Sequence, residues 1–277
     1  MFVSFLELIR LKDWLKNCLL FLPLIFSNNI KNIDKYNDLF IAFLLFCLAA
    51  AFIYIVNDIK DIENDKLHPI KKEKKPLASN KISINFAKLT LILILVIISI
   101  FLLTNQKYFF HIGLYVLINI IYTFFAKQIL LLDLFILSVG YIIRIDIGSV
   151  AIGVETSQLM FLTIFSLSFF VISLKRVGDL NINFNAKKNI YRNHSILLHF
   201  IVIISALLTI LFYSLYAIII NNNFLLTLPL IILILFRYFK KSINTNEGEF
   251  PLDLFFKDKI LLILSMLYIF YAVFIYL

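Results

Sequence analysis

The chain has 277 residues, of which 62% are hydrophobic and 16% charged, and its formal net charge is +9. Average soluble domains are about half apolar and about one quarter charged, so this composition excludes an ordinary soluble globular domain. The apolar residues form solid runs such as 89–103, 196–220 and 260–277. Such runs predict membrane-spanning helices, because about 20 apolar residues in a helix cross the hydrocarbon core.

The hydropathy pattern predicts an all-α polytopic membrane protein with about nine transmembrane helices, in one domain that covers residues 1–277. An amphipathic segment precedes the first span, because Phe2, Phe5, Leu8 and Ile9 recur at helical spacing. The predicted spans are 15–28, 39–56, 86–104, 108–126, 129–148, 158–174, 196–219, 223–239 and 259–277.

The distribution of basic residues predicts the orientation of these spans. With nine spans, 22 of the 26 Lys and Arg residues lie on the same side as the N-terminus, and the opposite side holds Lys31, Lys35 and Lys107. Loops rich in Lys and Arg stay in the cytoplasm. We therefore expect an inner-membrane protein whose N-terminus and charged loops are cytoplasmic. The net charge reflects this asymmetry and does not indicate nucleic acid binding.

A cluster of acidic residues follows the second predicted span. Asn57, Asp58, Asp61 and Asp65 appear where the apolar run ends, and their spacing places them on one face if the helix continues. Carboxylates on one face repel each other unless a cation lies between them. Hard oxygen ligands that fill part of a coordination shell suit Mg²⁺, which takes its other ligands from water and phosphate. We expect all four residues to bind Mg²⁺ and the three aspartates to be catalytic.

A basic stretch comes directly after these acids. It contains Lys66, His68, Lys71, Lys72, Lys74 and Lys75. The alternative to a metal site is a solvated loop that is acidic by chance. Carboxylates for a metal beside cations for phosphate favour a site for a Mg²⁺-bound diphosphate, with His68, Lys71 and Lys75 as candidate phosphate ligands.

These residues carry a family resemblance. The pattern N-D-x-x-D-x-x-x-D at 57–65 resembles the first aspartate-rich motif of the UbiA superfamily of intramembrane prenyltransferases. Further stretches resemble its decaprenyl-phosphate phosphoribosyltransferase branch. They are IRLKDWLKN at 9–17, DKLHP at 65–69 with KPLA at 75–78, YIIRIDIGSVA at 141–151 and KRVGDL at 175–180.

The resemblance implies a UbiA-like bundle that transfers 5-phosphoribose from phosphoribosyl pyrophosphate to a polyprenyl phosphate, with Mg²⁺, at the cytoplasmic membrane face. It also implies further substrate-binding residues: Lys16, Asn17, Tyr122, Lys127, Arg144, Lys175, Arg176 and Asp179, with Asp133 beside them. The chain departs from the branch at Lys75, where Arg is usual, and at Asp146, where the branch is apolar.

The segment after the sixth span separates two candidate functions. Ordinary UbiA prenyltransferases carry a second multi-aspartate motif here, whereas this chain has Asp179 beside Lys175 and Arg176. Further basic residues follow at Lys187, Lys188 and Arg192. Cations in place of the second acidic motif favour a diphosphate donor with a phosphate acceptor. The alternative is a prenyltransferase that moves a polyprenyl group from its diphosphate to an aromatic or other acceptor. A transporter or non-catalytic scaffold is a third possibility.

Arg144 and Asp146 lie inside an otherwise apolar span. Charges within the membrane are costly and usually line a cavity. Residues two positions apart do not share a helix face, so these two need not pair with each other. An interhelical contact and a substrate role are equally compatible with Arg144, and the resemblance assigns no role to Asp146.

Overall fold

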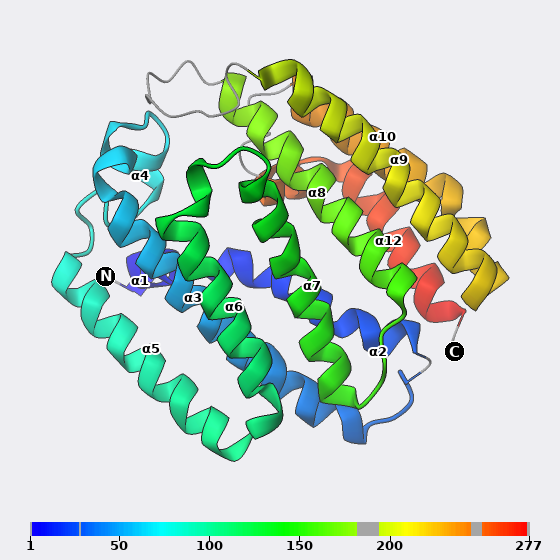
Figure 1. Cartoon of the computed structure of the whole chain (residues 1–277), viewed down its shortest axis with the longest axis horizontal. Helices are drawn as coiled ribbons and strands as arrows, with labels where there is room; N and C mark the ends of the chain where they lie inside the picture. Colours follow the sequence, from blue (N-terminus) through cyan, green and yellow to red (C-terminus); the bar gives the residue numbers. More distant parts are fainter. Residues whose placement is uncertain (1, 28, 182–193, 245–250, 276–277) are drawn as a thin grey trace.

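The computed structural model describes residues 2–27, 29–181, 194–244 and 251–275, and all regular structure in these ranges is helical (Figure 1). The first elements are α1 (Phe2–Leu8), the 3₁₀ helix η1 (Leu11–Phe21), α2 (Leu22–Phe26), α3 (Asp34–Leu67), α4 (Lys71–Lys74), α5 (Ile84–Thr104), η2 (Gln106–Tyr108) and α6 (Phe109–Phe124). The rest are η3 (Ala126–Gln128), α7 (Leu132–Ile152), α8 (Gln158–Asn181), α9 (Ser195–Ile220), η5 (Asn222–Thr227), α10 (Leu228–Asn244), α11 (Pro251–Lys257) and α12 (Lys259–Phe274).

Seven of the described helical segments are long and apolar enough to cross a membrane. They are α3, α5, η2 with α6, α7, α8, α9 and η5 with α10. Each contains or overlaps one of the predicted spans, and the last predicted span, at 259–277, corresponds to the shorter apolar helix α12. The prediction of a polytopic all-α membrane protein is confirmed, whereas the count of nine transmembrane helices is not.

The predicted first span, 15–28, is not one continuous helix. The 3₁₀ helix η1 ends at Phe21, and α2 begins at Leu22 with Pro23 in its first turn. Proline has no backbone N–H to donate, so a helix tolerates it in the first turn but not in the interior. The apolar run is therefore divided at this position.

Helix α7 joins three apolar clusters. Ile143 and Ile147 pack in a cluster with residues of α3, α5 and α6. Leu134 belongs to a second cluster, formed with α8 to α12, and Ile145 to a third, formed with α8, α9, η5 and α12. Figure 1 shows α7 between the α3–α5–α6 group and the α8–α9–α10 group. Polar residues on α7 can therefore contact both groups.

Gly148 allows the backbone of η1 to lie directly against α7. A Cβ atom at this position would lie 2.1 Å from the backbone oxygen of Leu20. We expect Gly148→Ala to lower the melting temperature of the detergent-solubilised protein by several degrees or more, because two backbones would have to separate. Gly113 on α6 is the control, since a Cβ there meets nothing within 4 Å. Alanine favours a helix over glycine by about 1 kcal/mol, so Gly113→Ala should not destabilise. Equal melting temperatures for the two variants would contradict this account.

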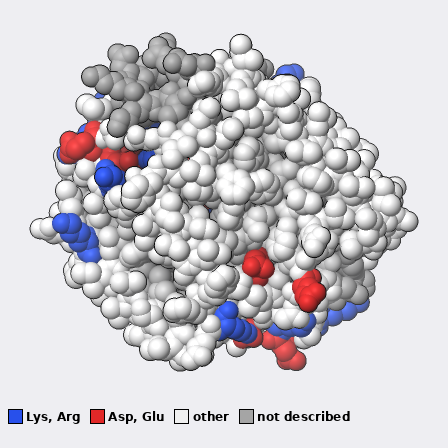
Figure 2. Space-filling view, in the orientation of Figure 1, with Lys and Arg blue, Asp and Glu red and all other residues white. Residues whose placement is uncertain are grey.

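The surface has a wide apolar belt. Figure 2 shows most of the visible charge near the ends of α3 to α5 and along the lower margin, with an uncharged field between. Large exposed apolar side chains of α5 and α9 include Ile92, Leu93, Phe200 and Leu207. A belt of this kind between two polar ends fits a protein embedded in lipid.

Candidate active site

The acidic face of α3 is the base of the site. Helix α3 continues to Leu67, so Asp58, Asp61 and Asp65 do share the helical register predicted for them. Asp58 and Asp65 are nearly inaccessible to solvent, at 2% and 6% exposure. Carboxylates buried this deeply need cations or hydrogen-bond donors to remain charged.

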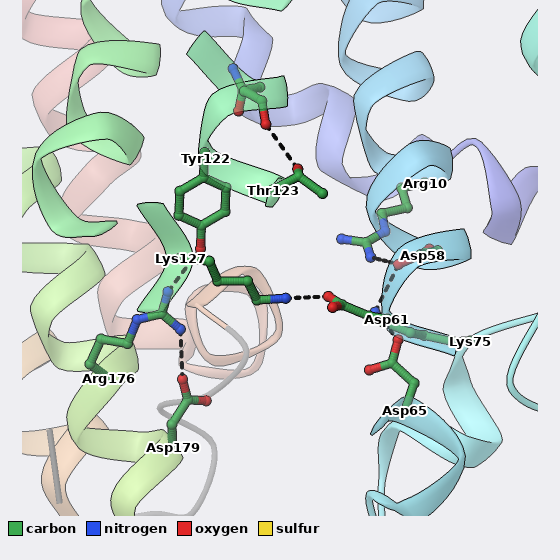
Figure 3. Close-up of polar contacts among 11 residues, drawn as sticks. Arg10, Asp58, Asp61, Asp65, Lys75, Tyr122, Thr123, Lys127, Arg176 and Asp179 are labelled. Carbon is green, nitrogen blue, oxygen red and sulfur yellow. Dashed lines mark hydrogen bonds and ion pairs between the residues drawn. The ribbon is translucent and has the colours of Figure 1, made fainter. Parts of the chain in front are cut away.

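Each aspartate of this face meets a basic side chain from another segment (Figure 3). Asp58 accepts from the guanidinium of Arg10 at 2.5 Å and from Lys75 Nζ at 2.8 Å. Lys75 Nζ also donates to Asp65 at 2.6 Å, and Lys127 forms an ion pair with Asp61. Asp58 and Asp65 thus converge on Lys75, while Asp61 points toward the α6–α7 turn.

Arg10 is a residue of the site that the sequence did not single out. Its backbone is left-handed, with φ 50° and ψ 53°, a conformation that costs a non-glycine residue energy and that clusters at functional sites. Burial lowers the pKa of Arg10, but the charges of Asp58 and Asp13 outweigh burial and hold that pKa above its ordinary value. Its partner Asp58 is 48 positions away, so no local spacing could have identified it.

A second group of polar residues faces the aspartates from α6, α7 and α8. The Arg176 guanidinium donates from Nε to Asp133 at 2.7 Å, from Nη1 to Asp179 at 3.0 Å and from Nη2 to the Tyr122 hydroxyl at 3.1 Å. Asp133 is 1% exposed. Figure 3 shows Tyr122, Arg176 and Asp179 opposite the α3 aspartates, with Lys127 extending toward Asp61. The planar guanidinium is held by three oxygens and has a fixed orientation.

Lys16 lies at the edge of the site and pairs with Asp13 at 2.6 Å. Burial lowers the pKa of Lys16, but Tyr54 and Asp13 raise it by more, so the net pKa is above its ordinary value. Burial raises the pKa of Asp13, but the charges of Lys16 and Arg10 lower it below its usual range. Both side chains therefore stay charged at neutral pH.

Arg144 makes contacts between helices and has no carboxylate partner among the contacts of the described residues. Its Nε donates to Asn17 Oδ1 at 2.8 Å and its Nη1 to the Gly140 carbonyl at 2.7 Å. The guanidinium also lies about 5 Å from the centres of three aromatic rings, those of Phe46, Tyr115 and Tyr141. These contacts account for a buried arginine in an apolar span and join η1 to α7.

Asp146 pairs with a histidine and not with Arg144. His111 Nε2 lies 3.0 Å from Asp146 Oδ2, across α6 and α7. The prediction that Arg144 and Asp146 need not pair with each other is therefore confirmed. This pair lies near the start of α6, whereas Tyr122 of the candidate active site lies at the other end of that helix.

The remaining predicted residues divide between structural contacts and the site. His68 Nδ1 accepts the backbone N–H groups of Ile70 and Lys71 and so caps the short helix α4. Lys175, one position before Arg176, is half-buried and lies within electrostatic range of Lys16 and Lys71. The basic residues Lys187, Lys188 and Arg192 lie outside the described residues.

The residues of the α3 face suit a magnesium ion in their chemistry. Asn57 Oδ1 is buried and has no hydrogen-bond partner among the described residues, so it is an oxygen with an unused lone pair beside Asp61. Carboxylate and amide oxygens are the ligands that Mg²⁺ prefers. Within the described ranges, however, no three His, Cys, Asp or Glu side chains already converge on one point.

Comparison with known proteins identifies the family of the chain. The model of the UbiA prenyltransferase family matches residues 20–257. A decaprenyl-phosphate phosphoribosyltransferase from Corynebacterium glutamicum is 28% identical over 96% of this chain and 84% of its own. One from Mycolicibacterium smegmatis is 31% identical over 76% of this chain and 69% of its own.

A solved structure of a UbiA homolog has a similar fold. A UbiA homolog from Archaeoglobus fulgidus, whose structure holds DMAPP and Mg²⁺, superposes with a TM-score of 0.74, over 97% of each chain and at 18% identity. The family match covers most of the chain, and the similarity of fold extends over nearly all of it. The chain therefore belongs to the UbiA prenyltransferase family.

Proposed function

We propose that this membrane transferase moves 5-phosphoribose from phosphoribosyl pyrophosphate to a polyprenyl phosphate. The observation that carries the proposal is the Arg176 group. Ordinary UbiA prenyltransferases carry a second multi-aspartate motif in this segment, whereas this chain has Lys175, Arg176 and the single acid Asp179 there. Arg176 is held by Asp179 and by Asp133 of α7. Basic side chains in place of a second acidic motif, opposite the acidic face of α3, suit two phosphorylated ligands. The names of the two relatives support the same reaction.

Four residues of α3 would hold the metal. Asn57, Asp58, Asp61 and Asp65 supply the oxygen ligands, and Mg²⁺ bound there would neutralise charge on the diphosphate. The cations that now meet the aspartates would turn to phosphate oxygens when a donor binds. Their exchange between carboxylate and phosphate keeps buried charges paired in both states.

These cations are Arg10, which contacts Asp58, Lys75, which contacts Asp58 and Asp65, and Lys127, which contacts Asp61. Lys16, Lys71, Lys175 and Arg176 would face the second phosphorylated ligand. Tyr122 and Asp179 orient Arg176 through its Nη atoms. We assign an indirect role to three residues that do not face a ligand. The contact between Arg144 and Asn17 holds η1 in place, and His68 holds α4 in place.

The reaction requires no strong general base. An oxygen of the polyprenyl phosphate attacks C1 of the ribose, a new C–O bond forms, and the bond from C1 to the diphosphate breaks. The acceptor phosphate is already ionised at pH 7. Negative charge collects on the departing diphosphate, where fixed Lys and Arg side chains stabilise it without reorganisation.

We further propose that residues 1–277 act as one domain in the inner membrane, with the active-site end in the cytoplasm. The excess of Lys and Arg at that end supports this orientation. The second candidate function is transfer of a polyprenyl group from its diphosphate, which the family match and a similar fold bound to DMAPP and Mg²⁺ support.

A donor assay separates the two candidates. The purified protein is incubated with Mg²⁺ and polyprenyl phosphate, and with phosphoribosyl pyrophosphate that is labelled in the ribose. We expect label in the lipid fraction, and loss of that label when EDTA removes Mg²⁺. The matched reaction supplies a labelled prenyl diphosphate and an aromatic acceptor. Prenyl transfer without any phosphoribosyl transfer would overturn the proposal in favour of the second candidate.

A further inference from the structure

An apolar groove, which we call the α6–α7 groove, runs between these two neighbouring helices (Figure 1). Its volume is about 190 Å³. It is lined by Ile118 and Ile121 of α6 and by Phe135, Ile136 and Val139 of α7. Ile121 and Phe135 are 41% and 50% exposed, so the groove opens to the outside of the bundle. A lining without polar side chains suits hydrocarbon and not a sugar or a diphosphate.

The α6–α7 groove ends beside Arg176. On the α6 wall, Tyr122 comes one turn after Ile118, and its hydroxyl accepts from Arg176 Nη2 at 3.1 Å. On the α7 wall, Asp133 comes one turn before Ile136, and its carboxylate accepts from Arg176 Nε at 2.7 Å. Each wall therefore carries, on its next turn, a side chain that holds the same guanidinium.

The Arg176 guanidinium keeps donors for an anion. Its contacts with Asp133, Asp179 and Tyr122 use one N–H group each from Nε, Nη1 and Nη2. Each Nη atom carries a second N–H group, and in the part of the chain that the structure describes neither of these has a hydrogen-bond partner. A pair of N–H groups on one guanidinium matches two oxygens of a phosphate. The apolar groove thus leads to a phosphate-binding group.

We infer that the α6–α7 groove binds the isoprenoid chain of the acceptor next to its phosphate, which meets Arg176. This inference rests on the proposed function and specifies the route of the acceptor. A cavity of about 150 Å³ lined by Leu, Ile and Phe takes up a benzene molecule, so this groove holds about one isoprene unit of one chain. The rest of the polyprenyl chain extends into the lipid. The acceptor therefore reaches Arg176 from the bilayer, whereas the donor reaches the α3 aspartates from water.

The first test uses the wild-type protein in lipid nanodiscs and needs no donor. The ligand is a polyprenyl phosphate with a diazirine in the isoprene unit next to the phosphate. After irradiation, we expect mass spectrometry to find the label within residues 118–121 and 135–139. Unlabelled polyprenyl phosphate should compete, whereas phosphatidylglycerol and a polyprenol without phosphate should not. Label confined to other helices would overturn the inference. Equal competition by phosphatidylglycerol would also overturn it, because the groove would then be a site for bilayer lipid.

The second test compares two substitutions at adjacent positions of α6. Ile118→Trp fills the groove, whereas Leu117→Trp adds the same bulk to a side chain that is 55% exposed and lies outside the lining. We expect Ile118→Trp to raise KM for polyprenyl phosphate about ten-fold, with KM for phosphoribosyl pyrophosphate unchanged, and Leu117→Trp to match the wild type. Equal KM values for polyprenyl phosphate in the two variants would contradict the inference. If Ile118→Trp does not fold, the labelling of the wild type decides the result.

The two tests separate this inference from the proposed function. A wild-type protein that is labelled in the groove but transfers no phosphoribose would lose the function and keep the groove as a polyprenyl phosphate site. A wild-type protein that transfers phosphoribose but is not labelled there would keep the function and lose the inference.

Discussion

Replacing Asp61 with alanine should lower phosphoribosyl transfer by at least about a hundred-fold. Asp61 is the central aspartate of the α3 face, and its neighbour at the preceding turn is Asn57, whose buried Oδ1 lacks a partner among the described residues. Removing the carboxylate would take away one oxygen ligand of the proposed metal site and also leave Lys127 without this ion-pair partner. The measurement is the initial rate of label transfer to lipid as a function of Mg²⁺ concentration. Asp61→Asn should retain more activity and require more Mg²⁺, since an amide oxygen is a weaker ligand.

A matched control is available at the opposite end of α3. Asp38 also pairs with a lysine, at 2.5 Å from Lys107, and both side chains are partly exposed. Asp38→Ala removes a carboxylate–lysine pair of the same type from the same helix. Asp38 lies near the first residue of α3, whereas the aspartates of the site lie near its last residue. Its rate and Mg²⁺ dependence should match those of the wild type. Near-normal turnover by Asp61→Ala would show that the metal site is assigned to the wrong residues.

Arg176→Leu should abolish transfer and destabilise the fold by about 3 kcal/mol or more. The substitution removes the guanidinium that contacts Asp133, and the Asp133 carboxylate is 1% exposed in a helical membrane protein. A buried carboxylate that loses its cation keeps the cost of desolvation without the compensating attraction. Thermal unfolding in detergent measures the stability, and the donor assay measures the activity.

A second substitution separates the structural role of Arg176 from its role in the site. Asp133→Asn in the Arg176→Leu background neutralises the buried carboxylate, so most of the lost stability should return while transfer stays abolished. Asp179→Asn is the milder control, because Asp179 is more exposed than Asp133 and shares the same arginine. Recovery of activity in the double variant would show that Arg176 only supports the fold.

The sequence by itself determined the features that depend on short stretches of chain. Runs of apolar residues established the membrane helices from α3 to α10, because the length of an apolar run is all that a helix needs to cross lipid. The spacing of Asp58, Asp61 and Asp65 established their common face, because helical periodicity is a local property. The motif at 57–65 also identified the family, which the comparisons confirmed.

Sequence was least informative where the chain is apolar but irregular. The segment at 15–28 has the hydropathy of a span, yet Pro23 divides it into η1 and α2. Its close approach to α7 at Gly148 could not be foreseen, since it depends on which helix packs against it. Hydropathy reports how much apolar surface a segment offers and not the backbone geometry with which it packs.

Only the tertiary structure decided which side chains meet. Arg10 and Asp58 are separated by 48 positions, Lys127 and Asp61 by 66, and Arg176 and Asp133 by 43. It likewise assigned Asp146 to His111. Contacts between helices depend on their relative rotation and crossing, which the packing of whole faces sets. The residues of the acidic face were thus readable from the chain, whereas the cations that oppose it required the folded bundle.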